Sequence, residues 1–394
     1  MPGDAKVGGT TMTMGGNRRI GFALSSAAVR PGRGRRPRLQ GGSSPHEFFP
    51  AASPGLSFGG FVATVAPMKH RTLGPTGRSV SEVGLGCWQL GANWGDVSDA
   101  DALATLFTAY ESGVTFFDTA DVYGDGRSER LVGGFLRDTR ARIVVATKLG
   151  RRGDPGWPAN FTPAAMRRHT EDSLQRLGVA ALDLTQLHCV PLEELRRGEV
   201  FATLRDLQRE GKIKAFGASV ETVEEALVCL EAPGLASLQF IFNLFRQKAV
   251  DELLPRVKAK GVAFIVRLPL ASGLLAGKYT AATQFPESDH RNFNRDGQAF
   301  NVGETFAGLP FARGVELADA LRAYVPPGLS LADFALRWCL DFEAVTTVIP
   351  GARNPAQARG NVHASDLAPL PMVLHAKLRR FYAEQVAAHI RGPY

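Results

Sequence analysis

The stretch "FFDTADVYGDGRSE", residues 116–129, contains the pattern that organises the whole chain. An apolar run ends in a carboxylate, Asp118, and Tyr123 follows in a turn rich in Gly and Asp. Burying a carboxylate is costly unless it is paired, and a tyrosine in a polar turn adds little to a core. The two residues are therefore either a local structural latch or partners in chemistry.

The same unit recurs along the chain from Lys69 onward, where near-continuous apolar runs alternate with helical patterns. Such runs indicate strands of a sheet that is covered on both faces. Predicted helices end at glycines, a helix-stop signal, as in residues 99–112, 163–177 and 250–260. Eight such units in about 300 residues predict an α/β fold, a parallel (β/α)8 TIM barrel. The alternative, an open doubly wound sheet, lacks its glycine fingerprint here. The predicted strands are residues 83–85, 115–118, 143–147, 182–188, 215–219, 237–242, 263–268 and 346–349.

Two further segments frame the predicted barrel. Before it, two short strands around a Gly-Pro turn predict an N-terminal β-hairpin. Between the seventh and eighth strands, residues 279–313 are polar with interspersed phenylalanines. A loop of this length is usually functional or disordered. On the C-terminal face of a barrel, it would overhang an active site.

Composition and cysteine content limit the class of protein. Of the 394 residues, 44% are hydrophobic and 21% are charged, as in soluble globular proteins. No apolar run approaches the ~18 residues that a membrane span needs. The four cysteines show no CxxC spacing, which argues against a disulfide framework or a zinc site and fits a reducing compartment. We therefore expect a cytoplasmic protein without a metal centre and without a membrane partner. The cysteines are Cys87, Cys189, Cys229 and Cys339.

The net charge of +8 is concentrated in the first 67 residues, which hold eight basic and two acidic residues. That difference of +6 leaves +2 for the remainder, which shows no footprint of a nucleic-acid binder. Residues 1–67 lack hydrophobic periodicity and are predicted to be a disordered basic tail rich in Gly, Pro and Ser, ahead of a barrel domain over residues 68–394. The tail could be an organelle-targeting transit peptide, a polybasic arm, or the product of an over-long start assignment before Met68. The third interpretation is favoured, because Gly and Pro suit no amphipathic targeting helix.

Titratable side chains follow three neighbouring predicted strands, where catalytic residues of a barrel lie. Asp118 ends the second strand, Lys148 follows the third, His188 ends the fourth, and Tyr123 lies in the loop after the second. Singly, each has a structural interpretation, such as a helix cap, a solvated strand end or a satisfied core histidine. Their convergence on one rim favours a catalytic site.

The four groups also make chemical sense together. A tyrosine hydroxyl has a pKa of ~10; a neighbouring cation favours the phenolate, and a carboxylate keeps that cation charged and oriented. An imidazole nearby can orient a carbonyl oxygen. The group predicts a proton donor aimed at a carbonyl, and the missing hydride implies a nicotinamide cofactor.

Seven motifs, from residue 68 to about residue 375, resemble the aldo-keto reductase family in order. The resemblance implies a (β/α)8 barrel with NADPH (NADP+) laid across its C-terminal rim and a catalytic tetrad of Asp118, Tyr123, Lys148 and His188. It makes Asp118 and Tyr123 parts of one proton relay. The motifs are "GVTFFDTADVYGDGRSERLVG", "VVATKLG", "DLTQLHCV", "FGAS", "LQFIFNLF", "LPLASGLLAGKY" and "VIPGARNPAQARGN".

The resemblance also assigns residues to the nicotinamide end of the cofactor. Ser219 and Gln239 match the positions that hold the carboxamide, while Val220 stands where the family often has Asn. Arg267 stands where many members place an aromatic ring against the nicotinamide, and a guanidinium plane can also stack.

The adenosine-phosphate end is matched near the eighth strand. A helix N-terminus suits phosphate there, and Arg353 offers a bidentate charge for the 2′-phosphate. The structural interpretation of Arg353 is an exposed arginine at a helix start. The matching residues are Gly351, Arg353, Gln357 and Asn361.

Tryptophans near the rim suggest an aromatic wall for an apolar carbonyl substrate. Trp88 is the expected pocket residue, whereas loop packing explains Trp94 and Trp157 nearly as well. We expect NADPH-dependent reduction of an aldehyde or ketone with tyrosine as general acid, in a monomer or weak homo-oligomer. The alternative is a non-catalytic, NADPH-binding regulatory subunit of the same family.

Overall fold

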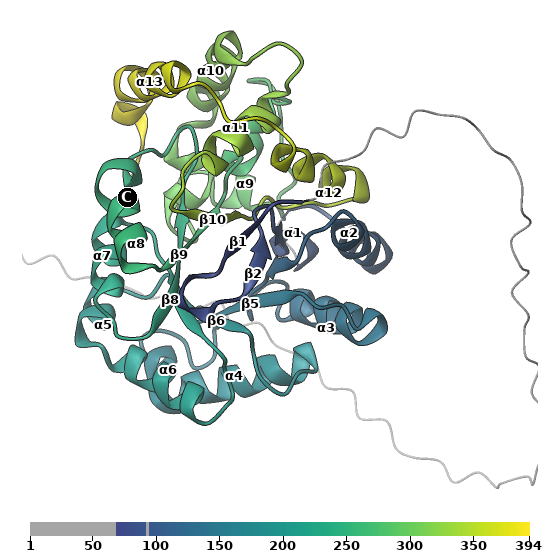
Figure 1. The fold of residues 1–394 in the computed structure, drawn as a ribbon, viewed down its shortest axis with the longest axis vertical. Helices are drawn as coiled ribbons and strands as arrows, with labels where there is room; N and C mark the ends of the chain where they lie inside the picture. The colour runs from purple at the N-terminus through teal and green to yellow at the C-terminus, as the bar shows by residue number, and fades with distance from the viewer. Residues whose placement is uncertain (1–67, 92–93) are drawn as a thin grey trace, which may run out of the picture. The chain divides into compact units, whose positions relative to one another are not determined.

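The structure, a computed structural model, describes residues 68–91 and 94–394. The predicted tail, residues 1–67, and its three interpretations lie outside the described residues. In the described part, eight parallel strands form one sheet in sequence order from β3 to β10 (Figure 1). The predicted eight-stranded barrel is confirmed. Its strands are β3 (Leu85–Gly86), β4 (Phe116–Asp118), β5 (Val144–Leu149), β6 (Leu184–His188), β7 (Phe216–Ser219), β8 (Leu235–Ile241), β9 (Ala263–Arg267) and β10 (Val345–Val348).

The barrel closes between its first and last strands through isolated parallel bridges. Val83 pairs with Val348, and Gly86 pairs with Gly351. A Cβ on Gly86 would lie 2.8 Å from the Ile349 carbonyl oxygen, so glycine permits this close approach. The first strand was predicted over residues 83–85, but its regular ladder covers only Leu85 and Gly86, because Val83 takes part only through its isolated bridge.

An antiparallel hairpin of β1 (His70–Thr72) and β2 (Ser79–Ser81) precedes the barrel, as predicted. Leu73 and Val80 are fully buried, in one cluster with residues of the strand interiors. In the turn, a Cβ on Gly74 would lie only 2.5 Å from the Ala236 carbonyl oxygen. The hairpin therefore packs against the starts of β8 and β9 and covers the N-terminal end of the barrel, opposite the rim where strands end.

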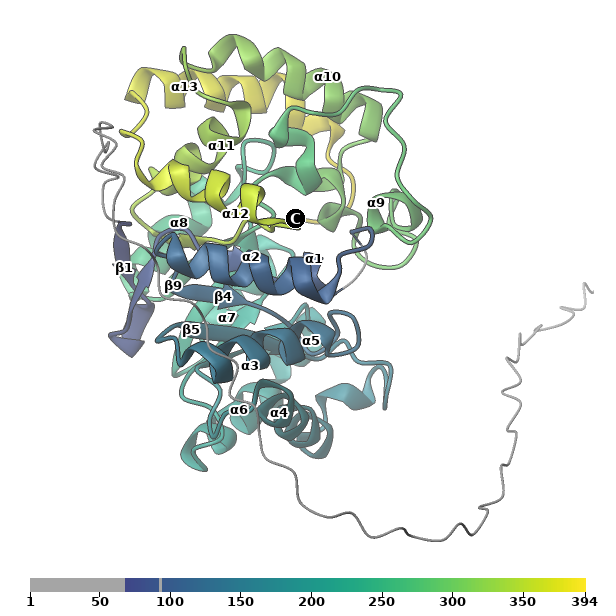
Figure 2. The same ribbon diagram turned by 90° about the vertical axis from the view of Figure 1, so that its right-hand side faces the viewer.

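Helices surround the sheet (Figure 2). The predicted helix over residues 163–177 has those bounds: the Thr162 hydroxyl accepts a hydrogen bond from the Ala165 N–H, and Gly178 ends the helix in a left-handed conformation. No helix among residues 68–91 and 94–394 is long and apolar enough to span a membrane. The helices are α1 (Trp88–Gly91), α2 (Asp99–Glu111), α3 (Arg127–Thr139), α4 (Pro163–Leu177), α5 (Leu192–Arg197), α6 (Glu199–Arg209), α7 (Val223–Leu230), α8 (Ala249–Lys260), α9 (His290–Phe293), α10 (Phe311–Leu321), α11 (Leu331–Leu340), α12 (Pro355–Val362) and α13 (Met372–Phe381).

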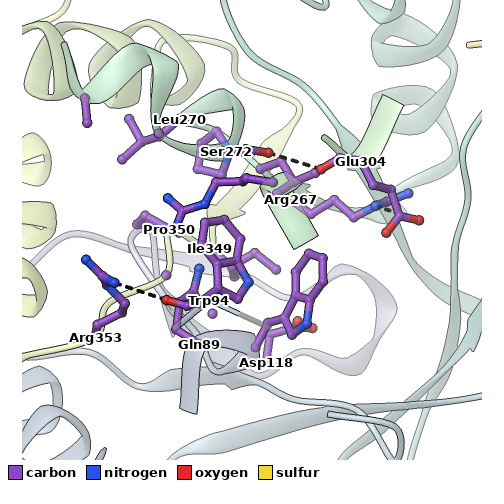
Figure 3. A pocket seen from close by; sticks show the side chains of 18 of the residues that line it. Gln89, Trp94, Asp118, Arg267, Leu270, Ser272, Glu304, Ile349, Pro350 and Arg353 are labelled. Carbon is purple, nitrogen blue, oxygen red and sulfur yellow. Dashed lines mark hydrogen bonds and ion pairs between the residues drawn. The ribbon is translucent and has the colours of Figure 1, made fainter. Parts of the chain in front are cut away.

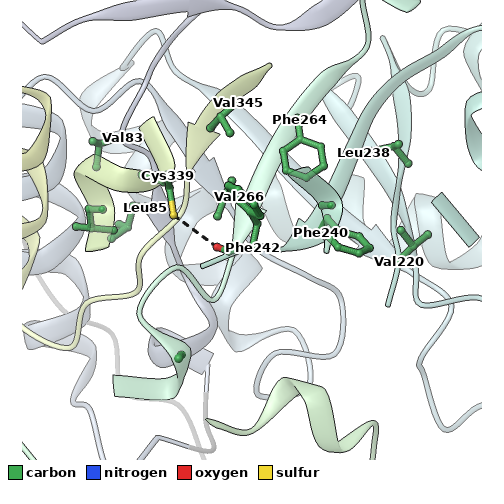
Figure 4. Packing of buried hydrophobic residues seen from close by; sticks show 14 of the residues in the cluster. Val83, Leu85, Val220, Leu238, Phe240, Phe242, Phe264, Val266, Cys339 and Val345 are labelled. Carbon is green, nitrogen blue, oxygen red and sulfur yellow. Dashed lines mark hydrogen bonds between the residues drawn. The ribbon is translucent and has the colours of Figure 1, made fainter. Parts of the chain in front are cut away.

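The main core lies between the strands and their helices (Figure 4). Phe242, after β8, stacks on Trp338 of α11 with ring centroids 4.8 Å apart. The Cys339 thiol donates to the Phe242 carbonyl oxygen at 3.6 Å. Full burial of a large apolar side chain such as Phe242 contributes about 1.5–3 kcal/mol to the stability of the fold. All four cysteines are free and buried.

Residues 279–313 are more structured than a polar loop. They contain α9 and two short 3-10 turns before α10 begins at Phe311. Phe306 is fully buried, and the buried Asp289 pairs with Arg291. Arg391 near the C-terminus fastens the segment by donating to the carbonyl oxygens of Gly308 and Leu309. This ordered segment lines the cavity at the strand ends, as predicted for the overhanging loop.

Candidate active site

A cavity of about 1230 Å³ opens at the carboxyl ends of the strands (Figure 3). This is the face on which barrel enzymes build their sites. All the residues assigned above to catalysis, cofactor or substrate line it except Lys148 and Ser219, which lie behind its wall. The structure thus brings together residues that span more than two hundred positions of sequence.

Lys148 sits at the centre of the catalytic group. Its ammonium donates to Asp118 Oδ2 at 2.5 Å, to the Thr119 carbonyl oxygen at 2.8 Å and to Tyr123 Oη at 3.2 Å. Asp118 and Lys148 end up adjacent because β4 and β5 are parallel neighbours. Gln239 of β8 donates to the other carboxylate oxygen of Asp118 at 2.7 Å. Every charge in this buried group is paired, as burial requires.

The charges of the group follow from these contacts. Burial alone would lower the pKa of Lys148, but Asp118 and Tyr123 outweigh it, and the net pKa is raised. Lys148 is therefore an ammonium, as expected. Burial raises the pKa of Tyr123 more than Lys148 lowers it. Lys148 thus favours the phenolate, as expected of a neighbouring cation, but burial outweighs this contribution and the phenol keeps its proton.

His188 ends β6 beside Tyr123, with ring centroids 6.0 Å apart and the rings nearly perpendicular. Burial, and then the positive charges of Arg151 and Lys148, hold the pKa of His188 well below its usual value. The ring is a neutral imidazole, able to donate or accept a hydrogen bond at the cavity.

Aromatic side chains form the wall next to the tyrosine. Trp88 begins α1 and stacks on Tyr123, with centroids 5.7 Å apart and planes 16° apart. Trp94 is nearly buried and packs edge-on against Trp88. Trp157 is 56% exposed at the mouth of the cavity. Phe300, from the segment of residues 279–313, also lines the cavity and was not foreseen in sequence.

Of the residues assigned to the nicotinamide, Ser219 and Arg267 end β7 and β9, and Gln239 lies within β8. The Ser219 hydroxyl donates to Gln239 Oε1 at 3.3 Å. Val220, in place of the usual Asn, buries its side chain and offers its carbonyl oxygen to Arg267 Nη2 at 3.2 Å. Arg267 is 9% exposed and projects into the cavity (Figure 3).

The residues assigned to the adenosine phosphates lie just before α12 and along it. Asn354, not singled out in sequence, caps this helix by accepting from the Gln357 N–H at 3.0 Å. Arg353 is exposed, and its Nη1 donates to the Trp94 carbonyl oxygen at 3.1 Å. The Asn361 amide donates to the Gly351 carbonyl oxygen at 3.2 Å. Arg353 and the N-terminus of α12 provide positive electrostatic potential at this part of the cavity, which suits a phosphate.

Four buried polar atoms on the cavity lining lack hydrogen-bond partners among the described residues. They are Gln89 Oε1, Trp94 Nε1, His188 Nδ1 and Arg267 Nε. Buried polar groups are normally satisfied. A long ligand with both donors and acceptors, such as a dinucleotide, fits this lining and the size of the cavity.

A cluster of four charged residues is here called the Arg–Glu wall: Arg151, Glu221, Arg267 and Glu304. Of these, only Arg267 was assigned a role from the sequence. Arg151 follows β5 and binds Glu304 Oε1 at 2.7 Å and Glu221 Oε1 at 3.1 Å. The strand-end rule could have found Arg151 and Glu221, but Glu304 comes from the segment of residues 279–313. Glu221, Glu304 and Cys189 also lie close enough together to hold a metal ion. The two guanidinium groups nevertheless already supply positive charge to these carboxylates.

Comparison with known proteins identifies the family of the chain. The model of the Aldo/keto reductase family matches residues 82–383. The chain is 30% identical over 302 residues to the aldo-keto reductase YhdN of Bacillus subtilis, covering 74% of this chain and 86% of that protein. It is also 30% identical over 332 residues to a probable voltage-gated potassium channel subunit beta of Arabidopsis thaliana, covering 78% and 94%. The holo structure of aldo-keto reductase AKR11C1 from Bacillus halodurans superposes with a TM-score of 0.65 at 28% identity, covering 82% and 98%. The chain belongs to the aldo/keto reductase family and is an oxidoreductase.

Proposed function

We propose that the protein reduces an aldehyde or ketone to an alcohol with NADPH, using Tyr123 as the general acid. The observation that carries the proposal is the hydrogen bond from Lys148 to Tyr123 Oη at the cavity, with Lys148 itself fixed by Asp118. When bound, the cofactor supplies a hydride to the carbonyl carbon.

The side chains do the proton chemistry. His188 and Tyr123 Oη position the carbonyl oxygen by hydrogen bonds, and Tyr123 transfers its proton to that oxygen as charge develops there. The phenolate left behind lies beside the ammonium of Lys148, which stabilises it. Asp118 keeps that ammonium charged and in place. A positioned general acid contributes ~10²–10⁴ in rate.

Two features support NADPH as the cofactor. Arg353 and the start of α12 put positive charge at one end of the cavity, which favours a phosphate. Gln239, one of the residues assigned to the nicotinamide, donates to Asp118 of the catalytic group, and Ser219 in turn donates to Gln239. Arg353 would bind the 2′-phosphate that NADH lacks, and so select NADPH.

The test is NADPH consumption at 340 nm with a panel of aromatic and aliphatic aldehydes and ketones, with Tyr123→Phe as the inactive control. Turnover by the parent and its loss in the variant would support the proposal. The similarity to a channel subunit supports a second candidate, a regulatory subunit that binds NADPH. Tight NADPH binding with no turnover on any carbonyl would favour that candidate.

A further inference from the structure

The Arg–Glu wall joins four separate parts of the chain at the cavity. Arg151 follows β5, Glu221 follows β7, Arg267 ends β9, and Glu304 lies in a 3-10 turn (Val302–Glu304) of the segment of residues 279–313. All four line the cavity. Their charges therefore act on whatever the cavity binds.

Glu304 is the centre of the wall. Its Oε1 lies 2.7 Å from Arg151 Nη2 and 3.6 Å from Arg267 Nη1, and its side chain is only 5% exposed. The Ser272 hydroxyl holds its backbone by donating to the Glu304 carbonyl oxygen at 3.1 Å (Figure 3). The carboxylate is therefore fixed between the two guanidinium groups.

The charge states of the wall can be assigned. Burial alone would raise the pKa of Glu304, but Arg151 and Arg267 outweigh it and hold that pKa well below its usual value. Glu304 is therefore an anion at any working pH. Burial alone would lower the pKa of Arg267, but the acidic groups around it raise the net value, so it is a cation. Burial and the Glu304 charge raise the pKa of Glu221 to about 7, which leaves Glu304 as the permanent negative charge of the wall.

We propose that Glu304 is the counter-charge to Arg267 that sets the relative affinity of the site for oxidised and reduced cofactor. The inference rests on the proposed function, in which Arg267 faces the nicotinamide. The oxidised ring carries a positive charge that the reduced ring lacks. An unbalanced guanidinium at this site would disfavour the oxidised form, and the Glu304 carboxylate offsets that repulsion. Glu304 thus sets this relative affinity through Arg267, without contacting the reacting atoms.

The experiment measures the dissociation constants of NADP+ and NADPH by isothermal titration calorimetry at pH 8, where Glu221 is ionised. In Glu304→Gln, which keeps the shape and removes the charge, the ratio Kd(NADP+)/Kd(NADPH) should rise on the order of tenfold, the size of a partly screened interaction between unit charges. Glu304→Asp should keep most of the parent ratio. The matched control is Glu287→Gln, because Glu287 is an exposed glutamate of the same segment; its ratio should not change.

Removing the positive charge of the pair tests the sign of the effect on Kd(NADP+)/Kd(NADPH). Arg267→Gln removes the positive charge, so the ratio should fall, and the double variant should return toward the parent value. Arg267→Gln also serves if Glu304→Gln fails to fold. An unchanged ratio in both single variants, or equal weakening of both nucleotides, would overturn the inference. Failure of the parent to bind either nucleotide would contradict the proposed function itself, and it would be seen before any variant is made.

Discussion

The Asp118–Lys148–Tyr123 group and the Arg–Glu wall hold similar buried charges but differ in where those charges come from. The first group comes from two adjacent strands and the turn after one of them, so the barrel itself fixes it. The wall needs Glu304 from a segment inserted between β9 and α10. The difference suggests that the barrel supplies the proton chemistry, whereas the inserted segment adjusts the environment of the cofactor and substrate.

The largest effect should come from removing the cation of the Asp118–Lys148–Tyr123 group. Lys148→Met should lower carbonyl reduction by ~10²–10⁴, the range for a positioned general acid, because the phenolate left on Tyr123 loses its stabilising charge. Combining it with Tyr123→Phe should cost little more than either change alone, since groups that act as a unit are not additive. Single-turnover kinetics with saturating NADPH measure both effects. If the rate losses of the two single variants multiplied in the double variant, the two residues would act independently.

A smaller effect is expected at the far end of the cavity. Arg353→Ala should weaken NADPH binding by roughly one to two decades, the value of a charge-assisted hydrogen bond of ~1.5–3 kcal/mol. NADH binding should hardly change, because NADH has no 2′-phosphate. Titration of both nucleotides against parent and variant checks this. Equal weakening of both would instead place Arg353 at the shared pyrophosphate or in a structural role.

The Arg–Glu wall should make the relative affinity for NADP+ and NADPH depend on pH. The pKa of Glu221 is raised to about 7, so its negative charge is present above that pH and is lost as pH falls through it. Kd(NADP+)/Kd(NADPH) should therefore rise a few-fold from pH 8 to pH 6. Of its neighbours, Glu304 has a lowered pKa, and Cys189, Arg151 and Arg267 have raised ones, so none of them titrates in this range. Glu221→Gln should flatten the profile; a profile that persists in that variant would exclude Glu221 as its source.

The smallest effect is expected from the N-terminal tail. A chain that begins at Met68 should keep the melting temperature and the turnover of the full chain, because residues 1–67 lack any core-forming pattern. Thermal unfolding and the aldehyde assay on both chains provide the comparison. A loss of several degrees, or of activity, would show that the tail packs on the barrel.

How far the sequence predicts the site depends on how the fold builds each part. Apolar runs locate the strand ends, so the sequence alone is enough to place Asp118, Lys148 and His188 on one rim. Arg151 and Glu221 follow the same rule but carry no motif of their own. Glu304 could not be found, because its position depends on hydrogen bonds within the inserted segment and to Ser272. The net pKa direction at Tyr123 also required the extent of burial, which no sequence pattern gives.

The claim that Tyr123 is the acid is tested most directly by single-turnover NADPH oxidation with a reactive aldehyde in Tyr123→Phe. This change removes one hydroxyl and keeps the ring that stacks on Trp88, so folding and NADPH affinity should stay close to the parent. The account predicts that the reduction step slows by at least ~10²–10⁴. Reduction within a few-fold of the parent rate, with NADPH fully bound, would show that another group donates the proton.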